Sequence, residues 1–286
     1  MMKKNNPTPR RHLPVGQALL TAPYILWMLI FILVPLGVVV FYALTDANTG
    51  LFTLDNLGKV FTGSFPAIFG RSLWYSLLAS LICLVIGYPV AYFIARQKPS
   101  VQRTLYMLVM LPMCMSFLLR TLAWVGLLQD TGIINNFLDA IGIGRLSLIR
   151  NPGAVVLGMV YNYLPYMILP LYSIIVKIDG RLIEAAEDLG CTPVQTFIKV
   201  VLPLSMPGIV SGLTMVLVPA VSTFYISQKL GGTEMLIGDV IERLFKQGNN
   251  ANLGAALSLV LMALVFVCTG IMNKITGSDG EDVVVV

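Results

Sequence analysis

Residues 177–204, KIDGRLIEAAEDLGCTPVQTFIKVVLPL, form a charged segment between two long apolar runs. Asp179 has the residue type and position of a helix N-cap, and we expect a helix over Leu182–Leu189. Gly190 follows, where helices commonly end in a left-handed residue. Residues 192–195 (TPVQ) then have the pattern of a capping box with proline in the first turn. The segment therefore predicts two short capped helices joined at Gly190.

The first of these helices has two different faces. The faces are Leu182, Ala185, Ala186 and Leu189 on one side and Glu184, Glu187 and Asp188 on the other. We expect the three acids to lie near the helix N-terminus, where the macrodipole favours negative charge. Small residues would let another surface approach closely, and acids would meet a basic partner. From these residues alone, a solvated connector remains the alternative.

The composition on either side of this segment indicates a membrane protein. Of the 286 residues, 57% are apolar and 12% charged, and the mean hydropathy is +0.83. A soluble domain carries about 25% charged residues. Six apolar segments are each long enough to cross a bilayer as a helix. They are Leu19–Leu44, Leu73–Ala95, Thr104–Leu128, Ala154–Val176, Leu204–Ile226 and Leu253–Met272.

The predicted fold class is therefore an all-α integral membrane protein with six transmembrane helices. We expect an N-terminal arm (1–18), a six-span domain (19–275) that contains the loop 177–203, and a short polar tail (276–286).

The lysines and arginines predict the orientation, because they favour cytoplasmic flanks. More of them lie in the arm, the tail and two of the loops than in the other flanks. This larger set is Lys3, Lys4, Arg10, Arg11, Arg96, Lys98, Arg103, Lys177, Arg181, Lys199 and Lys274. Both termini and the 177–203 loop are expected in the cytoplasm. The net charge of +5 does not indicate nucleic acid, since the basic residues are scattered at the ends of apolar runs.

Two loops on the opposite side carry apolar residues at helical spacing. One is Asp130–Gly144, with Ile133, Phe137 and Ile141; the other is Met235–Phe245. Both patterns predict short amphipathic helices. Two interpretations fit these helices equally well: a docking surface for an external partner, or packing against neighbouring spans.

The sequence shows no catalytic or metal-binding pattern. His12 is the only histidine, and no Gly-x-x-x-x-Gly-Lys-Ser/Thr, Gly-x-Ser-x-Gly or His-Glu-x-x-His pattern occurs. We therefore expect no catalytic residues, no metal ligands and no cofactor bound by this chain. If transport is driven by ATP, another subunit must hydrolyse it.

The charged segment resembles the EAA loop of permeases in type I ABC importers. The resemblance rests on Glu184-Ala185-Ala186, Gly190, Val200 and Leu202-Pro203; the family usually has Ile at the position of Val200. In that family the loop is a coupling helix that docks on a cytoplasmic ATPase. The resemblance implies an ATPase contact made by Glu184, Ala185, Ala186, Glu187, Asp188, Gly190, Leu202 and Pro203.

The resemblance also implies the fold, the partners and the location. The fold would be that of a type I ABC importer permease in the bacterial inner membrane, surrounded by lipid. The partners would be a second homologous permease, a cytoplasmic ABC ATPase dimer that hydrolyses Mg-ATP, and an extracytoplasmic solute-binding protein.

Further segments are similar to the first permease of spermidine/putrescine importers. They include Gly87-Tyr88-Pro89, residues 202–209 and residues 224–228. The resemblance implies a polyamine substrate. Gln228 departs from it, because we expect an acid near this position in some polyamine relatives. Another small organic solute and a stand-alone secondary transporter are the alternatives.

Polar and aromatic residues in the fourth and fifth spans are candidates for the solute path. They are Tyr161, Asn162, Tyr166, Ser222, Thr223, Tyr225 and Gln228. Aromatic faces attract ammonium groups, and prolines such as Pro112, Pro165 and Pro219 indicate interrupted helices that could line a cavity. Hydrogen bonds between helices and interfacial aromatic belts are the alternative. For Arg120, the one ion well inside a span, we expect a structural role near an outer gate.

Overall fold

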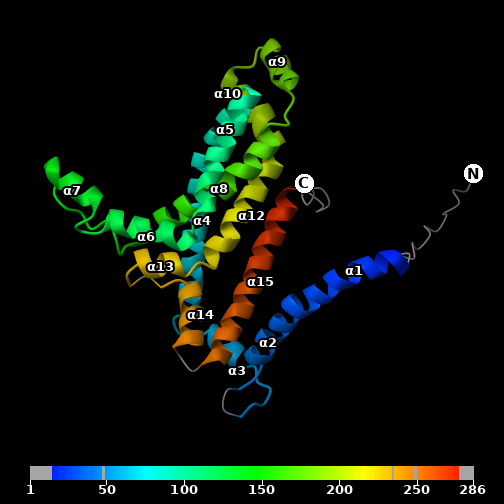
Figure 1. Ribbon diagram of the computed structural model, residues 1–286, viewed down its shortest axis with the longest axis vertical. Coiled ribbons are helices and arrows are strands. Elements are labelled where there is room, and N and C mark those ends of the chain that lie inside the picture. The colour runs from blue at the N-terminus through cyan, green and yellow to red at the C-terminus, as the bar shows by residue number, and fades with distance from the viewer. Residues whose placement is uncertain (1–14, 47–48, 234, 248–249, 277–286) are drawn as a thin grey trace, which may run out of the picture.

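The computed structural model describes residues 15–46, 49–233, 235–247 and 250–276 (Figure 1). Most of the predicted arm (1–14) and of the tail (277–286) therefore lies outside the described residues. Within them, every regular element is a helix, and the β-type pairing is limited to one isolated bridge between Thr45 and Phe52. The predicted all-α class is confirmed.

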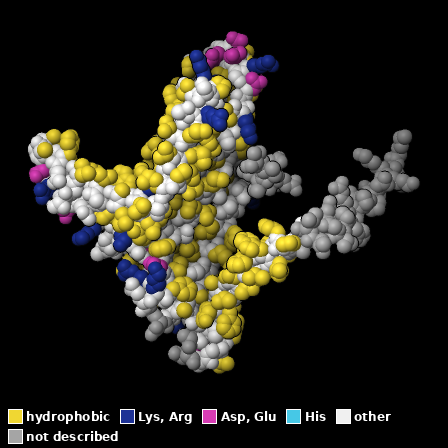
Figure 2. All heavy atoms as spheres, viewed as in Figure 1, with side chains coloured by type: hydrophobic (Ala, Val, Ile, Leu, Met, Phe, Trp, Pro, Cys, Tyr) yellow, Lys and Arg dark blue, Asp and Glu magenta, His cyan; other side chains and the backbone are white. Residues whose placement is uncertain are grey.

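Five helical stretches in the described part are long and apolar enough to cross a membrane. They are Pro23–Ala43, Phe65–Ala95, Phe117–Ala140, Pro152–Ile175 and Ala251–Lys274. A sixth is the pair Pro193–Leu204 and Met206–Val221, which is bent by 65°. Figure 2 shows apolar side chains along these shafts and charged side chains gathered toward the ends.

The N-terminal region is a long bent helix that leads away from the bundle (Figure 1). It consists of α1 (Val15–Met28), the π-helical stretch η1 (Leu29–Leu33) and α2 (Val34–Ala43). The Val34 amide bonds back to the Leu29 carbonyl, five residues earlier. Pro35 follows and has no amide hydrogen to continue the ladder, so we attribute the wide turn to it. None of the apolar window within Pro23–Ala43 is buried inside the chain.

Three helices form the centre of the bundle: α4 (Phe65–Ala95), α8 (Pro152–Ile175) and α12 (Met206–Val221). Small residues let them approach closely, as in many membrane bundles. A Cβ on Gly212 of α12 would lie 2.7 Å from Met167 Sδ of α8. The main cluster of buried apolar residues lies among these helices.

A second buried cluster joins both ends of the chain. It lies where α2 and α3 (Asp55–Val60) pack against α15 (Ala251–Thr276). The helix α14 (Ile237–Lys246) packs against α15 and α4. The Ser72 hydroxyl, which accepts the Ile237 amide at 2.8 Å, fixes the start of α14 to α4.

The second and third spans differ from the sequence prediction. The second begins at Phe65 instead of Leu73. The third, predicted over Thr104–Leu128, is three pieces: α5 (Pro99–Met110), the 3₁₀ turn η2 (Leu111–Cys114) and α6 (Phe117–Leu128). The extended backbone at Met115 separates η2 from α6. Pro112 lies at the break and cannot continue an α-helical ladder.

The two predicted amphipathic helices have different surroundings. In α14, Leu236 and Ile237 are fully buried, so packing against neighbouring helices is confirmed there. The other helix, α7 (Ile133–Ala140), leads away from the bundle beyond α6 (Figure 1). Its Ile133 and Phe137 side chains are 71% and 65% exposed, so that apolar face is uncovered.

Candidate coupling loop and solute path

The predicted coupling loop stands at one end of the molecule, beyond the ends of α4 and α8 (Figure 1). It consists of α9 (Gly180–Asp188), α10 (Pro193–Thr196), the π-helical stretch η3 (Phe197–Val201) and α11 (Leu202–Leu204). A bend of 65° at the following residue, Ser205, leads into α12. The loop is therefore continuous with a central helix of the bundle.

The caps of α9 form as the sequence predicts. The Asp179 carboxylate accepts the Arg181 amide at 3.0 Å. Gly190 has φ +84°, and its amide bonds to Glu187 O at 2.9 Å, while Cys191 N bonds to Ala186 O at 3.0 Å. This pair of bonds is a Schellman motif, which needs the left-handed residue that glycine adopts without strain.

The second helix also begins as predicted. The Thr192 hydroxyl accepts the Gln195 amide at 3.4 Å, and the Gln195 side chain accepts the Thr192 amide at 3.0 Å. The capping box is confirmed. Leu202 N then bonds to Phe197 O, five residues back, directly before Pro203. This repeats the arrangement at Pro35, with a π-turn directly before a proline.

One detail of the loop was predicted wrongly. Glu184, Glu187 and Asp188 lie in the second half of α9, whose first turn holds no acid. The helix begins at Gly180, two residues before the predicted start, and so the macrodipole does not stabilise these acids. Their exposure leaves them available to a partner, and Figure 2 shows acidic and basic side chains together at this tip.

The predicted apolar face of α9 is mostly uncovered. Ala186 is buried, but Leu182 is 48% and Leu189 86% exposed. Val194 on α10 is 66% exposed. Exposed apolar residues gathered on a small element indicate an interaction surface.

Aromatic contacts connect the loop to the bundle. The Phe197 ring lies edge-on to Tyr88 and Tyr92 of α4, with centroid distances of 5.4 and 6.0 Å. The Tyr88 hydroxyl bonds to the Ser205 hydroxyl at 2.7 Å. These contacts link the loop to α4 and to the start of α12.

The predicted solute-path residues do not gather in one place. Tyr225 lies beside Phe117, with ring centroids 6.3 Å apart, and Tyr166 is connected to the same Phe117 through Tyr163, with successive centroid distances of 6.3 and 6.4 Å. Thr223, buried in the break before α13 (Tyr225–Leu230), contributes to the same cluster. The aromatic cluster, as we call it, thus joins α6, α8 and α13.

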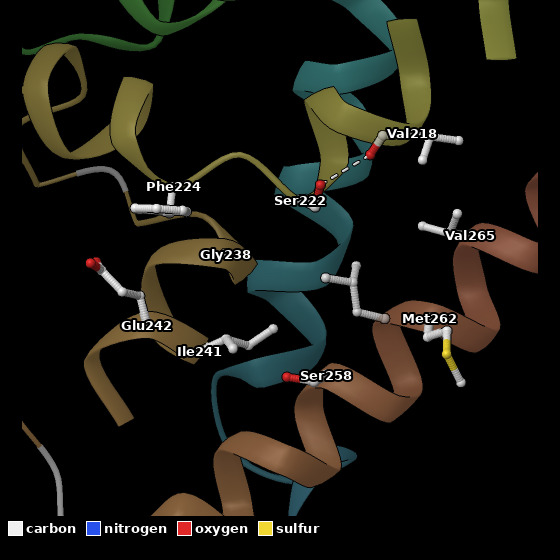
Figure 3. A pocket seen from close by; sticks show the side chains of 10 residues that line it. Val218, Ser222, Phe224, Gly238, Ile241, Glu242, Ser258, Met262 and Val265 are labelled. Atoms are coloured by element: carbon white, nitrogen blue, oxygen red, sulfur yellow. Dashed lines mark hydrogen bonds between the residues drawn. The ribbon is translucent and has the colours of Figure 1, made fainter. Parts of the chain in front are cut away.

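Three of the other candidates have separate contacts. Tyr161 packs against Trp124 at 5.3 Å, and Asn162 is fully buried and donates to the Gly158 carbonyl at 2.9 Å. Ser222 lines a cavity of about 390 Å³ between α12, α14 and α15, with Phe224, Glu242 and Ser258 (Figure 3). The remaining wall of this cavity is apolar.

Gln228 has an acidic neighbour that the sequence prediction missed. Its amide donates to the Glu242 carboxylate on α14. One turn earlier, Asp239 accepts the Ser227 hydroxyl at 2.5 Å and the Leu236 amide at 3.3 Å. Burial raises the pKa of Asp239 above its ordinary value of 3.8, and these hydrogen bonds oppose the rise. The available signal was the polar face of α14, which carries both acids three residues apart.

Arg120, on α6, is 5% exposed. Its Nε and Nη1 atoms have no hydrogen-bond partner among the described residues. The structural role near an outer gate stays a prediction.

This arrangement defines a multi-pass membrane protein with an exposed pair of short helices at one end. The family of binding-protein-dependent transport system inner membrane components matches residues 84–276, and the chain belongs to it. It is therefore a transport component and not an enzyme, as predicted.

Several curated relatives are similar along most of the chain. The spermidine/putrescine transport system permease protein PotB of Haemophilus influenzae is 37% identical over 89% of this chain and 93% of that protein. PotB of Escherichia coli K12 is also 37% identical, over 82% of this chain and 88% of that protein. The inner membrane ABC transporter permease protein YdcU of E. coli K12 is 27% identical over 85% and 82%.

Solved structures show the same fold. A chain of a bacterial ABC transporter involved in the import of the acidic polysaccharide alginate matches with a TM-score of 0.72, 20% identity and coverage of 93% of this chain and 96% of that one. A chain of the MetNI methionine ABC transporter matches with a TM-score of 0.57, 19% identity and coverage of 76% and 98%. The predicted permease fold is confirmed.

Proposed function

We propose that this chain is a permease subunit of an ATP-driven importer whose solute is a polyamine such as spermidine or putrescine. It forms half of the solute path with a second, homologous permease. Its coupling loop docks on a cytoplasmic ABC ATPase dimer that hydrolyses Mg-ATP, and an extracytoplasmic binding protein delivers the solute.

The coupling loop is the observation that carries the coupling part of the proposal. It places Glu184, Ala185 and Gly190 on an element that is capped at both ends and largely uncovered. Because both helices are capped, the loop can move as a rigid unit. The Phe197 contact and the bend at Ser205 would then carry its displacement to the helices of the bundle. Closure of the ATPase would thereby favour one of two states of the path.

The placement of the elements supports a cytoplasmic loop and cytoplasmic termini. The last helix, α15, runs from α14 toward the end of the molecule that carries α9 (Figure 1). The end with α3 and α14 is opposite, and so it faces outward in this orientation. The lysine and arginine distribution favours the same assignment.

Similarity to permeases named for spermidine and putrescine supports the polyamine assignment. The aromatic cluster offers ring faces to an ammonium group, each worth about 0.5–2 kcal/mol.

The decisive experiment is transport by the whole importer in proteoliposomes. We expect uptake of radiolabelled spermidine or putrescine that requires ATP on the loop side and binding protein on the other. ATP-dependent uptake of a different solute class, without competition by polyamines, would contradict the substrate assignment. Uptake by this chain without the ATPase would contradict the coupling assignment and favour a secondary transporter.

A further inference from the structure

A polar cavity of about 460 Å³ opens beside α13 and α14, in the half of the molecule that lies away from the coupling loop. Figure 2 shows lysine and arginine side chains gathered in this region. The lining side chains are all long and polar. They are Gln228, Lys229, Glu242, Arg243, Lys246 and Gln247. Three cations thus face one carboxylate.

The single carboxylate is already matched by one of the cations. Lys246 Nζ lies 2.5 Å from Glu242 Oε1, and the Gln228 amide donates to the other oxygen. The bond from Lys246, and then that from Gln228, holds the pKa of Glu242 below its ordinary value. Glu242 is therefore ionised at neutral pH, and it neutralises Lys246.

No carboxylate oxygen of the described residues lies within ion-pair distance of Lys229 or Arg243, although the nearby charge of Arg243 favours ionisation of Asp239 and Glu242. Lys229 Nζ lies 5.7 Å from the centre of the Tyr225 ring, and Arg243 is exposed. Asp239, one turn before Arg243, is buried and bonded to Ser227 instead. On the α7 side of the molecule, by contrast, Arg145 pairs with Asp139 at 3.6 Å. Two positive charges of the cavity therefore form no ion pair within the described part of the chain.

These charges do not suit a polyamine, because a polycation would be repelled by Lys229 and Arg243. They suit an acidic surface that arrives from outside. We propose that the cavity beside α13 and α14 docks an acidic patch of the extracytoplasmic binding protein, whose carboxylates pair with Lys229 and Arg243. The inference rests on the proposed function for the identity of the partner.

Charges at the edge of an interface act mainly on the rate of encounter and on its salt dependence. The same two cations disfavour entry of unescorted polyamine until a docked protein covers them. Docking and exclusion of free solute would then use one pair of side chains.

The test measures association of the purified binding protein with the complete importer in nanodiscs of zwitterionic lipid. We expect the double variant Lys229→Glu with Arg243→Glu to lower the association rate about tenfold or more at low salt, with the difference shrinking at high salt. The neutral pair Lys229→Gln with Arg243→Gln should give an intermediate loss. The matched control is Arg145→Gln, an outer cation that already has a partner, and it should bind at the wild-type rate.

The outcomes separate this inference from the proposed function. If the binding protein associates at the same rate with intact wild-type importer and with intact charge-reversed importer, the docking inference is wrong and the proposed function stands. If the wild-type importer recruits no binding protein, the proposed function itself fails. If charge reversal matters only when anionic phospholipid is added to the nanodiscs, the cavity binds lipid headgroups, and the docking inference is again wrong.

Discussion

The hydroxyl groups of Tyr88 and Ser205, 117 residues apart in the chain, form a buried hydrogen bond of 2.7 Å. Ser205 also donates to the Leu202 carbonyl at 3.0 Å, so Tyr88 is the donor of the shared bond. Ser205 is the residue at which the coupling loop bends by 65° into α12. The bond therefore fixes the bend to α4, beside the Phe197 ring that packs on Tyr88.

Removing this bond with Tyr88→Phe should weaken the link between the loop and the bundle. We expect a loss of about 1 kcal/mol in stability, the usual net value of one hydrogen bond. We also expect uptake per ATP hydrolysed to fall severalfold, because ATPase motion reaches α4 less completely. Parallel measurements of uptake and hydrolysis in proteoliposomes check this.

Tyr92→Phe is the matched control. Tyr92 contacts the same Phe197 ring, but its hydroxyl has no hydrogen bond among the described residues. The Tyr92→Phe variant should therefore have the wild-type ratio of uptake to ATP hydrolysis. Equal uptake-to-hydrolysis ratios in wild type and Tyr88→Phe would show that the bond plays no part in coupling.

The turn after α9 depends on the positive φ of Gly190. A side chain there would meet nothing within 4 Å, so Gly190→Ala adds backbone strain without a clash. The left-handed conformation costs an L-residue about 1–2 kcal/mol. We expect α9 to lose its fixed angle to α10, and recovery of the ATPase with the purified permease to fall, together with uptake.

Gly180→Ala provides the comparison within the same helix. Its added Cβ also meets nothing within 4 Å, and Gly180 does not have a positive φ. This variant should recover the ATPase as wild type does. If both glycine variants behave alike, the left-handed turn is not what positions the loop.

The sequence predicted the caps of this loop correctly because helix caps are local. Asp179, Thr192 and Gln195 each bond to a backbone amide within three residues, so their spacing is sufficient to identify them. Gly190 is recognised for the same reason. The positions of most spans also followed from hydropathy, which depends on composition along a short stretch.

The sequence prediction failed where the structure depends on contacts between residues far apart in the chain or on polar residues within an apolar helix. Span two begins early, at Phe65 with Pro66 in its first turn, and Ser72 in the added segment is buried because its hydroxyl accepts the distant Ile237 amide. The pairing of Gln228 with Glu242 needs the turn between α13 and α14, which no periodicity specifies. The solute path was predicted as one set, although Tyr161, Ser222 and Tyr225 face different neighbours.

If the aromatic cluster binds ammonium groups, Tyr225→Ala should raise the KM for spermidine about 2–30-fold, since one cation–π contact is worth about 0.5–2 kcal/mol. Uptake at varied spermidine concentration measures the change. Trp74→Ala removes an aromatic side chain that is 60% exposed on α4 and lies outside the predicted path, so it should leave KM unchanged. Equal effects of both substitutions would indicate a general disturbance of the bundle and contradict the assignment.

The carboxyl of Asp239 should make stability depend on pH. Its pKa in the folded protein is raised by burial, so the folded state holds the proton more strongly than the unfolded state does. The contribution of this group to stability is therefore greatest below the ordinary value of 3.8 and is lost as pH rises through the raised pKa. Asp239→Asn keeps an oxygen for Ser227 and removes the charge. We expect its melting temperature in detergent at neutral pH to equal or exceed that of wild type, with the gap narrowing toward pH 4.

Asp239→Ala separates the hydrogen bond from the charge. It leaves the buried Leu236 amide without its 3.3 Å acceptor, whereas the Ser227 hydroxyl keeps a second acceptor, the Phe224 carbonyl at 2.9 Å. One stranded buried donor costs about 1–3 kcal/mol, so this variant should melt below wild type across the whole pH range of the measurement. If Asp239→Asn melts as low as Asp239→Ala at neutral pH, then the ionised carboxylate stabilises α14, and the expected destabilising effect of this buried charge is contradicted.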